Sequence, residues 1–295
     1  MTLTSRPYGN TGDRQLIHEL LRSAAGRSST PAYGTVGDFE WWLVNDDDPT
    51  ALRSSTLWFD GDARLVAFTW PNAPYFDLFV HPSRRDLDAL LLHDWVTRQP
   101  AEAGELTVHC LDSDTARIEA LNANGFAATG RGFDDWVQPL DSLPDDATPV
   151  PVPEGYVIRS FAGEIEIESR VAAHRSAFHP SRMTVEKHAR ALASPLYRQD
   201  LDLVAVAPDG QIASYTLVWF DEVNGKGLFE PVGTHADHRR LGLSRCVIHE
   251  GLRRLKALGA DYAFVNSTAG DVPSNRLYAS CGFRIVDGVT IWKRP

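Results

Sequence analysis

The stretch from Gly227 to Leu258 constrains the fold of this chain more than any other part of the sequence. It begins with an extended, half-apolar run that ends at Thr234. Apolar residues then recur with helical spacing from Val247 onward, and Gly259 follows where a helix would stop. The pattern therefore predicts a strand, a tight loop and a helix, in that order.

The loop between the predicted strand and helix has the composition of an anion-binding site. It gathers two cations, a glycine and a small hydroxyl residue at the helix start: Arg239, Arg240, Gly242 and Ser244. A helix start has unpaired N–H groups and the positive end of the helix dipole, and a glycine lets an anion approach the backbone. These features favour a cradle for phosphate or pyrophosphate. A solvated basic helix start is the alternative interpretation.

A second stretch predicts a strand at Asp261–Ser267, a short helix and a further strand at Phe283–Val286. Pro273 suits the first turn of that helix. Tyr278 lies on the helix, and Gly282 ends it. The chain thus predicts two successive units in which a strand is followed by a helix.

Together the two stretches resemble the acetyl-CoA loop and the later tyrosine motif of the GNAT superfamily of N-acyltransferases. The loop motif reads Arg/Gln-x-x-Gly-x-Gly/Ala, and Arg239, Gly242 and Ser244 occupy its positions, with serine in the last. The later motif reads Asn-x-Pro-Ala-x-x-Leu-Tyr-x-x-x-Gly-Phe. Asp271–Phe283 matches it with aspartate in the first position and serine in place of the alanine. The resemblance covers the chain from about Tyr156 to its C-terminus.

The resemblance implies where acetyl-CoA binds. In the superfamily the cofactor lies where the fourth and fifth strands splay apart, and these correspond here to Gly227–Thr234 and Asp261–Ser267. Strand backbone groups would pair with the pantetheine arm, and the loop with its arginines would hold the pyrophosphate. The implied cofactor-binding residues are Val232, Gly233, Thr234, Arg239, Arg240, Leu241, Gly242, Leu243, Ser244 and Arg245.

Tyr278 is the implied general acid for the coenzyme A sulfur, because of its place in the later motif. A neutral phenol can donate a proton, and its ordinary pKa of about 10 keeps it protonated at neutral pH. A packed tyrosine on a short helix is the alternative interpretation.

Glu230 is the candidate general base. It shares strand parity with Val232 and Thr234, so it would face the splay and act directly or through a water. This expectation depends on regular alternation along the strand, which a bulge would break. An ordinary strand carboxylate is the alternative, and His235 is the second candidate base.

The first half of the chain repeats the pattern of the second. Ser113–Phe126 aligns without gaps on Gly270–Phe283, and Arg85 falls opposite Arg239. This indicates a duplication of one whole domain, as opposed to a short-period repeat.

The two copies differ where chemistry would take place. Asp88 stands in the place of Gly242, and Leu121 stands in the place of Tyr278. An aspartate facing a pyrophosphate would repel it, and a leucine cannot donate a proton. The N-terminal copy is therefore predicted to be degenerate and non-catalytic, and to support the other copy or shape its substrate site.

These observations predict an α/β protein of two tandem GNAT-like domains, each a mixed, mainly antiparallel sheet flanked by helices. The degenerate domain spans residues 1–140, and its last segment, Phe126–Val137, predicts two short strands around Gly130-Arg131-Gly132. A proline-rich linker at 141–153 precedes the catalytic domain at 154–295. A degenerate first copy followed by a catalytically competent second copy is similar to the architecture of mycothiol synthases.

The composition sets limits on function. A chain of 295 residues with 43% hydrophobic and 23% charged residues is an ordinary globular protein. Its formal net charge of −10 argues against general nucleic-acid binding. No membrane-spanning run or secretory signal is evident, which predicts a cytoplasmic protein. The cysteines, Cys110, Cys246 and Cys281, have no metal-ligand spacing, so we expect them to be buried and expect no metal.

The sequence thus predicts an acetyl-CoA-dependent N-acetyltransferase that acts on a small amine by direct transfer in a ternary complex. A mycothiol synthase-type acetyltransferase is the enzyme alternative. A non-catalytic acyl-CoA-binding sensor or scaffold is the second class, because a fold does not determine an activity. Retention of both Gly242 and Tyr278 argues against the sensor, which needs the glycine but not the tyrosine.

Overall fold

The structure is a computed structural model that describes residues 3–48, 50–72, 75–100, 104–143 and 151–295. The predicted linker at 141–153 therefore lies largely outside the described residues.

The first half of the chain alternates helices and strands as its apolar patterns predict. Its helices are α1 (Thr11–Ala25), α2 (Val36–Asn45), α3 (Leu87–Arg98) and α4 (Thr115–Ala123), with short 3₁₀ turns η1 (Ala51–Ser54) and η2 (Pro82–Arg84). Its strands are β1 (Thr4–Pro7), β2 (Thr56–Phe59), β3 (Leu65–Asn72), β4 (Tyr75–Val80), β5 (Leu106–Leu111) and β6 (Ala127–Pro139).

The second half repeats this order. Its helices are α5 (Ile167–Ala177), α6 (Val185–Leu192), α7 (Leu243–Ala257) and α8 (Val272–Ser280), with 3₁₀ turns η3 (Gly163–Glu166), η4 (Gln199–Leu201) and η5 (Ala236–His238). Its strands are β7 (Val157–Ser160), β8 (Asp202–Val206), β9 (Ile212–Asp221), β10 (Lys226–Thr234), β11 (Tyr262–Thr268) and β12 (Arg284–Arg294).

All the described strands join one sheet of 12 strands in the order β1-β2-β3-β4-β5-β12-β6-β11-β10-β9-β8-β7. Within the described residues, the parallel pairs are β4–β5 and β10–β11, and the other neighbours are antiparallel. The predicted fold class, a mixed and mainly antiparallel sheet flanked by helices, is confirmed. Each half has its parallel pair in the same place, as a duplication requires.

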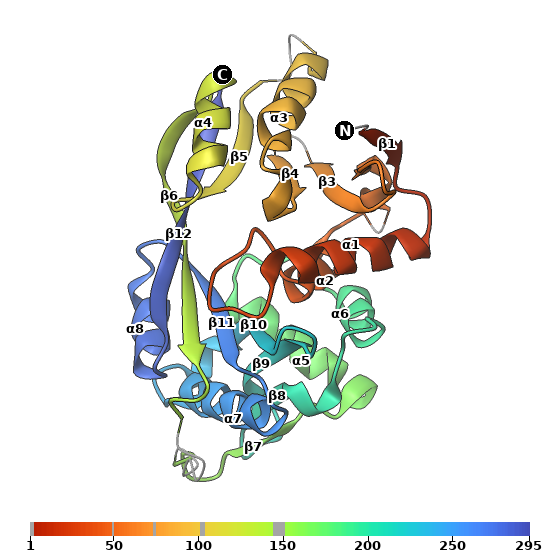
Figure 1. Cartoon of the computed structure of the whole chain (residues 1–295). Helices are drawn as coiled ribbons and strands as arrows, with labels where there is room; N and C mark the ends of the chain where they lie inside the picture. Colours follow the sequence, from red (N-terminus) through yellow and green to blue (C-terminus); the bar gives the residue numbers. More distant parts are fainter. Residues whose placement is uncertain (1–2, 49, 73–74, 101–103, 144–150) are drawn as a thin grey trace.

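The two halves exchange their last strands at the centre of the sheet. β12 pairs with β5 of the first half, while β6 pairs with β11 of the second half. β6 and β12 also pair with each other along most of their lengths. Figure 1 shows the final strand rising from the lower half to end beside α4 in the upper half. Each half of the sheet is therefore completed by a strand from the other.

The central strands differ from the sequence prediction. The pattern predicts two short strands around Gly130-Arg131-Gly132, but β6 is one continuous strand of 13 residues. Its partner β12 runs to Arg294, well beyond the predicted Phe283–Val286. The register shifts between β6 and β12 absorb the irregular backbone. Gly132 is the extra residue at one shift and Gly130 pairs with Ile291, so these glycines lie within the strand and not in a turn.

Helices α1 and α2 lie between the two halves, as Figure 1 shows. Arg22 of α1 forms an ion pair with Asp221 at the end of β9. α2 lies so close to the second half that a Cβ atom on Gly37 would be 2.5 Å from the Cβ of Trp219. Trp41 of α2 shares one hydrophobic core with Leu228 of β10. The first half thus forms part of the wall around β10.

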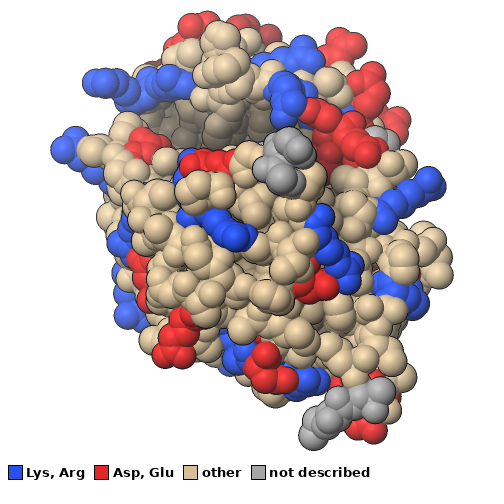
Figure 2. Space-filling view, turned by 90° about the horizontal axis from the view of Figure 1, so that it is seen from above, with Lys and Arg blue, Asp and Glu red and all other residues tan. Residues whose placement is uncertain are grey.

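The surface and the cysteines are in line with a globular chain. In the described part of the chain, no helix is both long and apolar enough to cross a membrane. Cys110, Cys246 and Cys281 are buried free thiols, as expected. Figure 2 shows basic and acidic side chains interspersed over one face of the molecule, with a deep hollow opening on it.

Candidate active site

Strands β10 and β11 splay apart partway along their length. They pair only from Lys226 to Leu228 on the β10 side, although β10 continues along β9 to Thr234. The backbone N–H of His235 donates to β9, at Ala213. Because the hydrogen-bonding direction alternates along an antiparallel strand, the backbone groups of Val232 and Thr234 point away from β9 and toward the splay. The geometry leaves strand edge free there for a bound molecule.

A bulge in β10 changes the direction of Glu230. Between Phe229 and Val232 the register with β9 shifts by one residue. Val232 packs into the core on the α7 and α8 side of the sheet, whereas Glu230 lies near Asp38 and Trp41 of α2. The expectation that Glu230 and Val232 share a face was wrong, because the extra residue reverses the alternation.

The loop after β10 leaves an open helix start. Gly242 has a φ of 78°, and a Cβ atom there would meet nothing within 4 Å. Gly242 is the N-cap of α7 and supplies no capping side chain, so the first-turn N–H groups have no side-chain cap. Arg240 also has a positive φ, of 64°. Leu241 is exposed, and Leu243 is buried behind the loop.

Three arginines surround this helix start. Arg239, Arg240 and Arg245 are all exposed, and none of them forms an ion pair with a carboxylate of the described residues. Arg239 donates from Nη2 to the carbonyl oxygen of Ala177 at 3.1 Å. The hydroxyl of Ser244 bonds inward to that of Thr234. The loop is thus electropositive and free to receive an anion.

The corresponding loop of the first half is closed by its own charges. Asp88 is buried, 2.8 Å from Nη2 of Arg117 and 3.0 Å from Nε of Arg85. Arg85 also pairs with Asp114 at the start of α4. The alignment with Gly242 predicts that Asp88 faces outward, and this prediction is wrong. Asp88 turns inward and engages Arg85, the counterpart of Arg239.

Tyr278 lies in a mostly apolar pocket beside the splay. Its side chain is 7% exposed and packs edge-on against Trp136 of β6 and against Phe283. Its hydroxyl has no hydrogen-bond partner among the described residues. Burial, followed by the charge of Glu230, raises the pKa of Tyr278, so the phenol is protonated at neutral pH. Leu121, its counterpart in the first half, is fully buried core.

Glu230 is half-buried and electrostatically unusual. Burial and the nearby Asp38 raise the pKa of Glu230 to about 8, and the Trp41 side chain partly offsets this. Nε1 of Trp219 donates to the Glu230 carbonyl oxygen at 2.8 Å and so anchors the bulge. A carboxyl with a pKa close to working pH suits a general base.

The sequence did not identify two further carboxylates, Asp38, whose charge acts on Glu230, and Asp135, on which the charge of Asp38 also acts. Burial, with the charges of Asp38 and Asp287, raises the pKa of Asp135 on β6 to about 7. Burial also raises the pKa of Asp38. No sequence signal could have found them, since α2 and β6 meet β10 only through the tertiary fold. Among the described residues, no group of three or more possible ligands could hold a metal ion.

Comparison with known proteins places these features in a family. Residues 168–283, which include the loop and Tyr278, match the acetyltransferase (GNAT) family. A search of curated protein sequences found no significant match.

Solved structures resemble nearly the whole chain. A GCN5-related N-acetyltransferase from Sphaerobacter thermophilus is 19% identical, with a TM-score of 0.65 over 99% of this chain and 95% of its own. A tandem GNAT protein from the clavulanic acid biosynthesis pathway is 17% identical, with a TM-score of 0.66 over 99% and 98%. A GNAT-family acetyltransferase from Colwellia psychrerythraea is 13% identical, with a TM-score of 0.66 over 99% and 100%. At these identities the likeness establishes the fold.

Proposed function

We propose that the chain is a tandem GNAT acyltransferase that transfers an acetyl group from acetyl-CoA to a small cationic amine, because residues 168–283 match the acetyltransferase (GNAT) family and nearly the whole chain has the fold of a tandem GNAT protein. The observation that supports this most directly is the contrast between the two loops. In the second half, Arg239, Arg240 and Gly242 surround an uncapped helix start. In the first-half loop, Arg85 is instead paired with Asp88. Within the parts of the chain that the structure describes, the second half alone offers a free cradle for pyrophosphate.

The strand edge above that cradle suits an amide-bearing chain. The inward-facing backbone groups of Val232 and Thr234 would pair with the pantetheine arm, and the first-turn N–H groups of α7 would hold the pyrophosphate. The exposed Arg239, Arg240 and Arg245 add positive charge. This arrangement would bring the thioester toward Glu230 and Tyr278, and the charge of Glu230 raises the pKa of Tyr278.

The acceptor side of the site is acidic. Asp38 lies close enough to both Glu230 and Asp135 that its charge raises the pKa of each of them. Carboxylates crowded in this way are stabilised by a bound cation, which favours an ammonium substrate. N-terminal helix α2 contributes Asp38, so the degenerate half shapes the substrate site.

The same residues can supply the proton transfers of direct attack. Glu230 takes a proton from the bound ammonium, and the neutral amine forms a bond to the thioester carbonyl carbon. As the carbon–sulfur bond breaks, Tyr278 donates its proton to the departing sulfur. The new amide nitrogen loses its extra proton to the Tyr278 phenolate, and Glu230 releases its proton to water. The products are the N-acetylated amine, the free thiol of coenzyme A and one proton, so atoms and charges balance.

Replacement of Glu230 by glutamine tests the base through pH. The wild-type rate should rise with pH up to about 8, because Glu230 must be ionised to accept a proton and its pKa is raised to about 8. The variant should lose this limb and turn over about 10²-fold more slowly.

Stability gives an independent readout of the same group. Between its ordinary pKa of 4.5 and the folded-state pKa of about 8, Glu230 is ionised in the unfolded chain but protonated in the folded one. The free energy of unfolding of the wild type should therefore fall as pH rises through this window. The free energy of unfolding of Glu230→Gln, relative to that of the wild type, should be higher at pH 9 than at pH 4. The exposed Glu222→Gln serves as control. If the rate of Glu230→Gln rises with pH as the wild-type rate does, Glu230 is not the base, and the base is water, His235 or another group.

The proposed function itself is tested by incubating the protein with acetyl-CoA and a panel of small amines, and measuring release of free thiol. Cationic primary amines should accelerate release above the rate of hydrolysis, and mass spectrometry should find the N-acetyl product. If calorimetry shows bound acetyl-CoA while hydroxyl acceptors are acetylated and amines are not, the amine assignment is wrong.

A further inference from the structure

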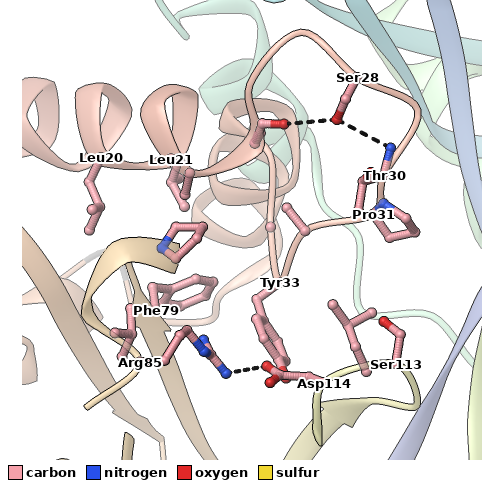
Figure 3. Close-up of a pocket in the computed structure, with 17 residues that line it drawn as sticks. Leu20, Leu21, Ser28, Thr30, Pro31, Tyr33, Phe79, Arg85, Ser113 and Asp114 are labelled. Atoms are coloured by element: carbon pink, nitrogen blue, oxygen red, sulfur yellow. Dashed lines mark hydrogen bonds and ion pairs between the residues drawn. The ribbon is translucent and has the colours of Figure 1, made fainter. Parts of the chain in front are cut away.

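The first half contains a cavity of about 470 Å³ at the splay of its own parallel strands. β4 and β5 pair only at Tyr75 and Thr107, and the cavity lies at the open end of the pair, between Val80 and Leu111. Figure 3 shows it roofed by α1 and by the loop that leads to Tyr33. Its volume is in the range of sites that hold small organic molecules.

One wall of this cavity is apolar. Leu20, Leu21 and Ala24 of α1 face Phe79 of β4, and Pro31 lies across the cavity from them, next to Thr30 of the loop. Such a wall favours a ligand with a hydrocarbon or aromatic body.

The other end of the cavity is polar and electrically balanced. Arg85 and Asp114 both line it and pair with each other. Behind them, Asp88 pairs with Arg85 and with the buried Arg117, and the ring of Tyr33 covers the Arg117 guanidinium at 3.7 Å. Two arginines thus face two aspartates. A charged ligand would lose its hydration in the cavity and meet no unpaired group of opposite charge, so its binding would carry a desolvation cost.

An unused hydrogen-bond donor remains at this end of the cavity. Asp114 already accepts from the Tyr33 hydroxyl at 2.6 Å, from the Arg117 backbone N–H at 3.1 Å and from Arg85. The Ser113 hydroxyl donates to Asp287. Arg85 uses Nε and Nη2 toward carboxylates, and its Nη1 has no partner within the described parts of the chain. A ligand in the cavity would therefore accept a hydrogen bond from Arg85.

The cavity is held open by contacts with the second half. Lys226 at the start of β10 donates to the carbonyl oxygens of Ala25 at 2.9 Å and Thr30 at 3.5 Å, both lining residues. Arg27, between them, pairs with Asp261. The roof is thus fixed before any ligand arrives, which lowers the entropic cost of binding.

From this arrangement we infer that the first half binds a small uncharged molecule that has an apolar body and a carbonyl-type acceptor, between α1 and the β4–β5 splay. The apolar body lies against Leu21, Ala24 and Phe79, and the acceptor meets Arg85. This site is separate from the catalytic loop around Gly242, and it needs no acetyl transfer to be measured.

The test uses three probes of one shape: 4-phenylbutanamide, 4-phenylbutanoate and 4-phenylbutylamine. Each is titrated by calorimetry into the full chain saturated with coenzyme A, which fills the second-half cradle. Binding is assigned to the first-half cavity where the cavity variants described below remove it, which separates it from binding of the amine at the acceptor site around Glu230. The amide should bind at one site per chain, at least tenfold more tightly than the carboxylate or the amine. Equal affinity for all three, or a preference for a charged probe, would overturn the inference.

Two variants locate the binding. Ala24→Trp fills the cavity from α1, and Thr30→Trp narrows it from the exposed side of the loop. Each should weaken amide binding at least tenfold, while Gln15→Trp, on the exposed face of α1, should leave it unchanged. Thermal melting verifies that each variant folds. If Ala24→Trp does not fold, Thr30→Trp provides the test. Amide binding that survives in a folded cavity variant, or absence of binding to the wild type, would exclude this site.

Discussion

Tyr278→Phe is expected to lower turnover by about 10²–10⁴-fold while leaving acetyl-CoA affinity nearly unchanged, since this is what loss of a general acid costs. The phenylalanine keeps the ring contacts with Trp136 and Phe283, so the apolar pocket stays filled. Only the hydroxyl is removed, and it has no partner among the described residues whose loss would disturb the fold. Steady-state kinetics with a rate-limiting chemical step and calorimetric titration of the cofactor provide the two measurements.

Tyr262→Phe is the matched control, because it removes a phenol from neighbouring strand β11 without touching the pocket of Tyr278. It should retain wild-type turnover. If Tyr278→Phe also turns over at the wild-type rate, Tyr278 has no part in proton transfer and is a packing residue.

Gly242→Asp is expected to abolish tight acetyl-CoA binding, and the wild-type chain to bind one acetyl-CoA. The substitution places a carboxylate at the open helix start, where it repels the pyrophosphate. Two like charges in partly exposed surroundings cost about 1–4 kcal/mol, or roughly tenfold or more in affinity. The positive φ of Gly242 adds backbone strain, which a matched control must reproduce.

Gly259→Asp is that control. Gly259 follows the other end of α7, has a φ of 81° and has open space around its Cβ position, so the strain and the added charge are alike. It should leave acetyl-CoA affinity unchanged, and calorimetric stoichiometry measures both variants. Two wild-type sites of similar affinity, or a tight site that survives Gly242→Asp, would mean that the first-half loop is competent despite Asp88.

Local features of this protein were readable from the sequence because neighbouring residues decide them. The helix after Gly242 follows from apolar spacing over 15 residues, and its open start follows from a glycine where a capping side chain would stand. The strands on either side alternate or run apolar for the same reason. The duplication was also readable, since it preserves the order of elements, and the repeated β4–β5 and β10–β11 pairs reflect it.

The tertiary structure alone decided how these parts meet. The exchange of β6 and β12 depends on which strand edges remain free after each half has formed its other pairs, and no local pattern encodes that choice. The bulge that turns Glu230 toward α2, and the ion pairs that turn Asp88 inward, depend on partners far away in the chain. The acceptor site combines Glu230 with Asp38, 192 positions earlier. Their proximity comes from packing of whole elements, in which shape and buried charge outweigh the preferences of any short segment.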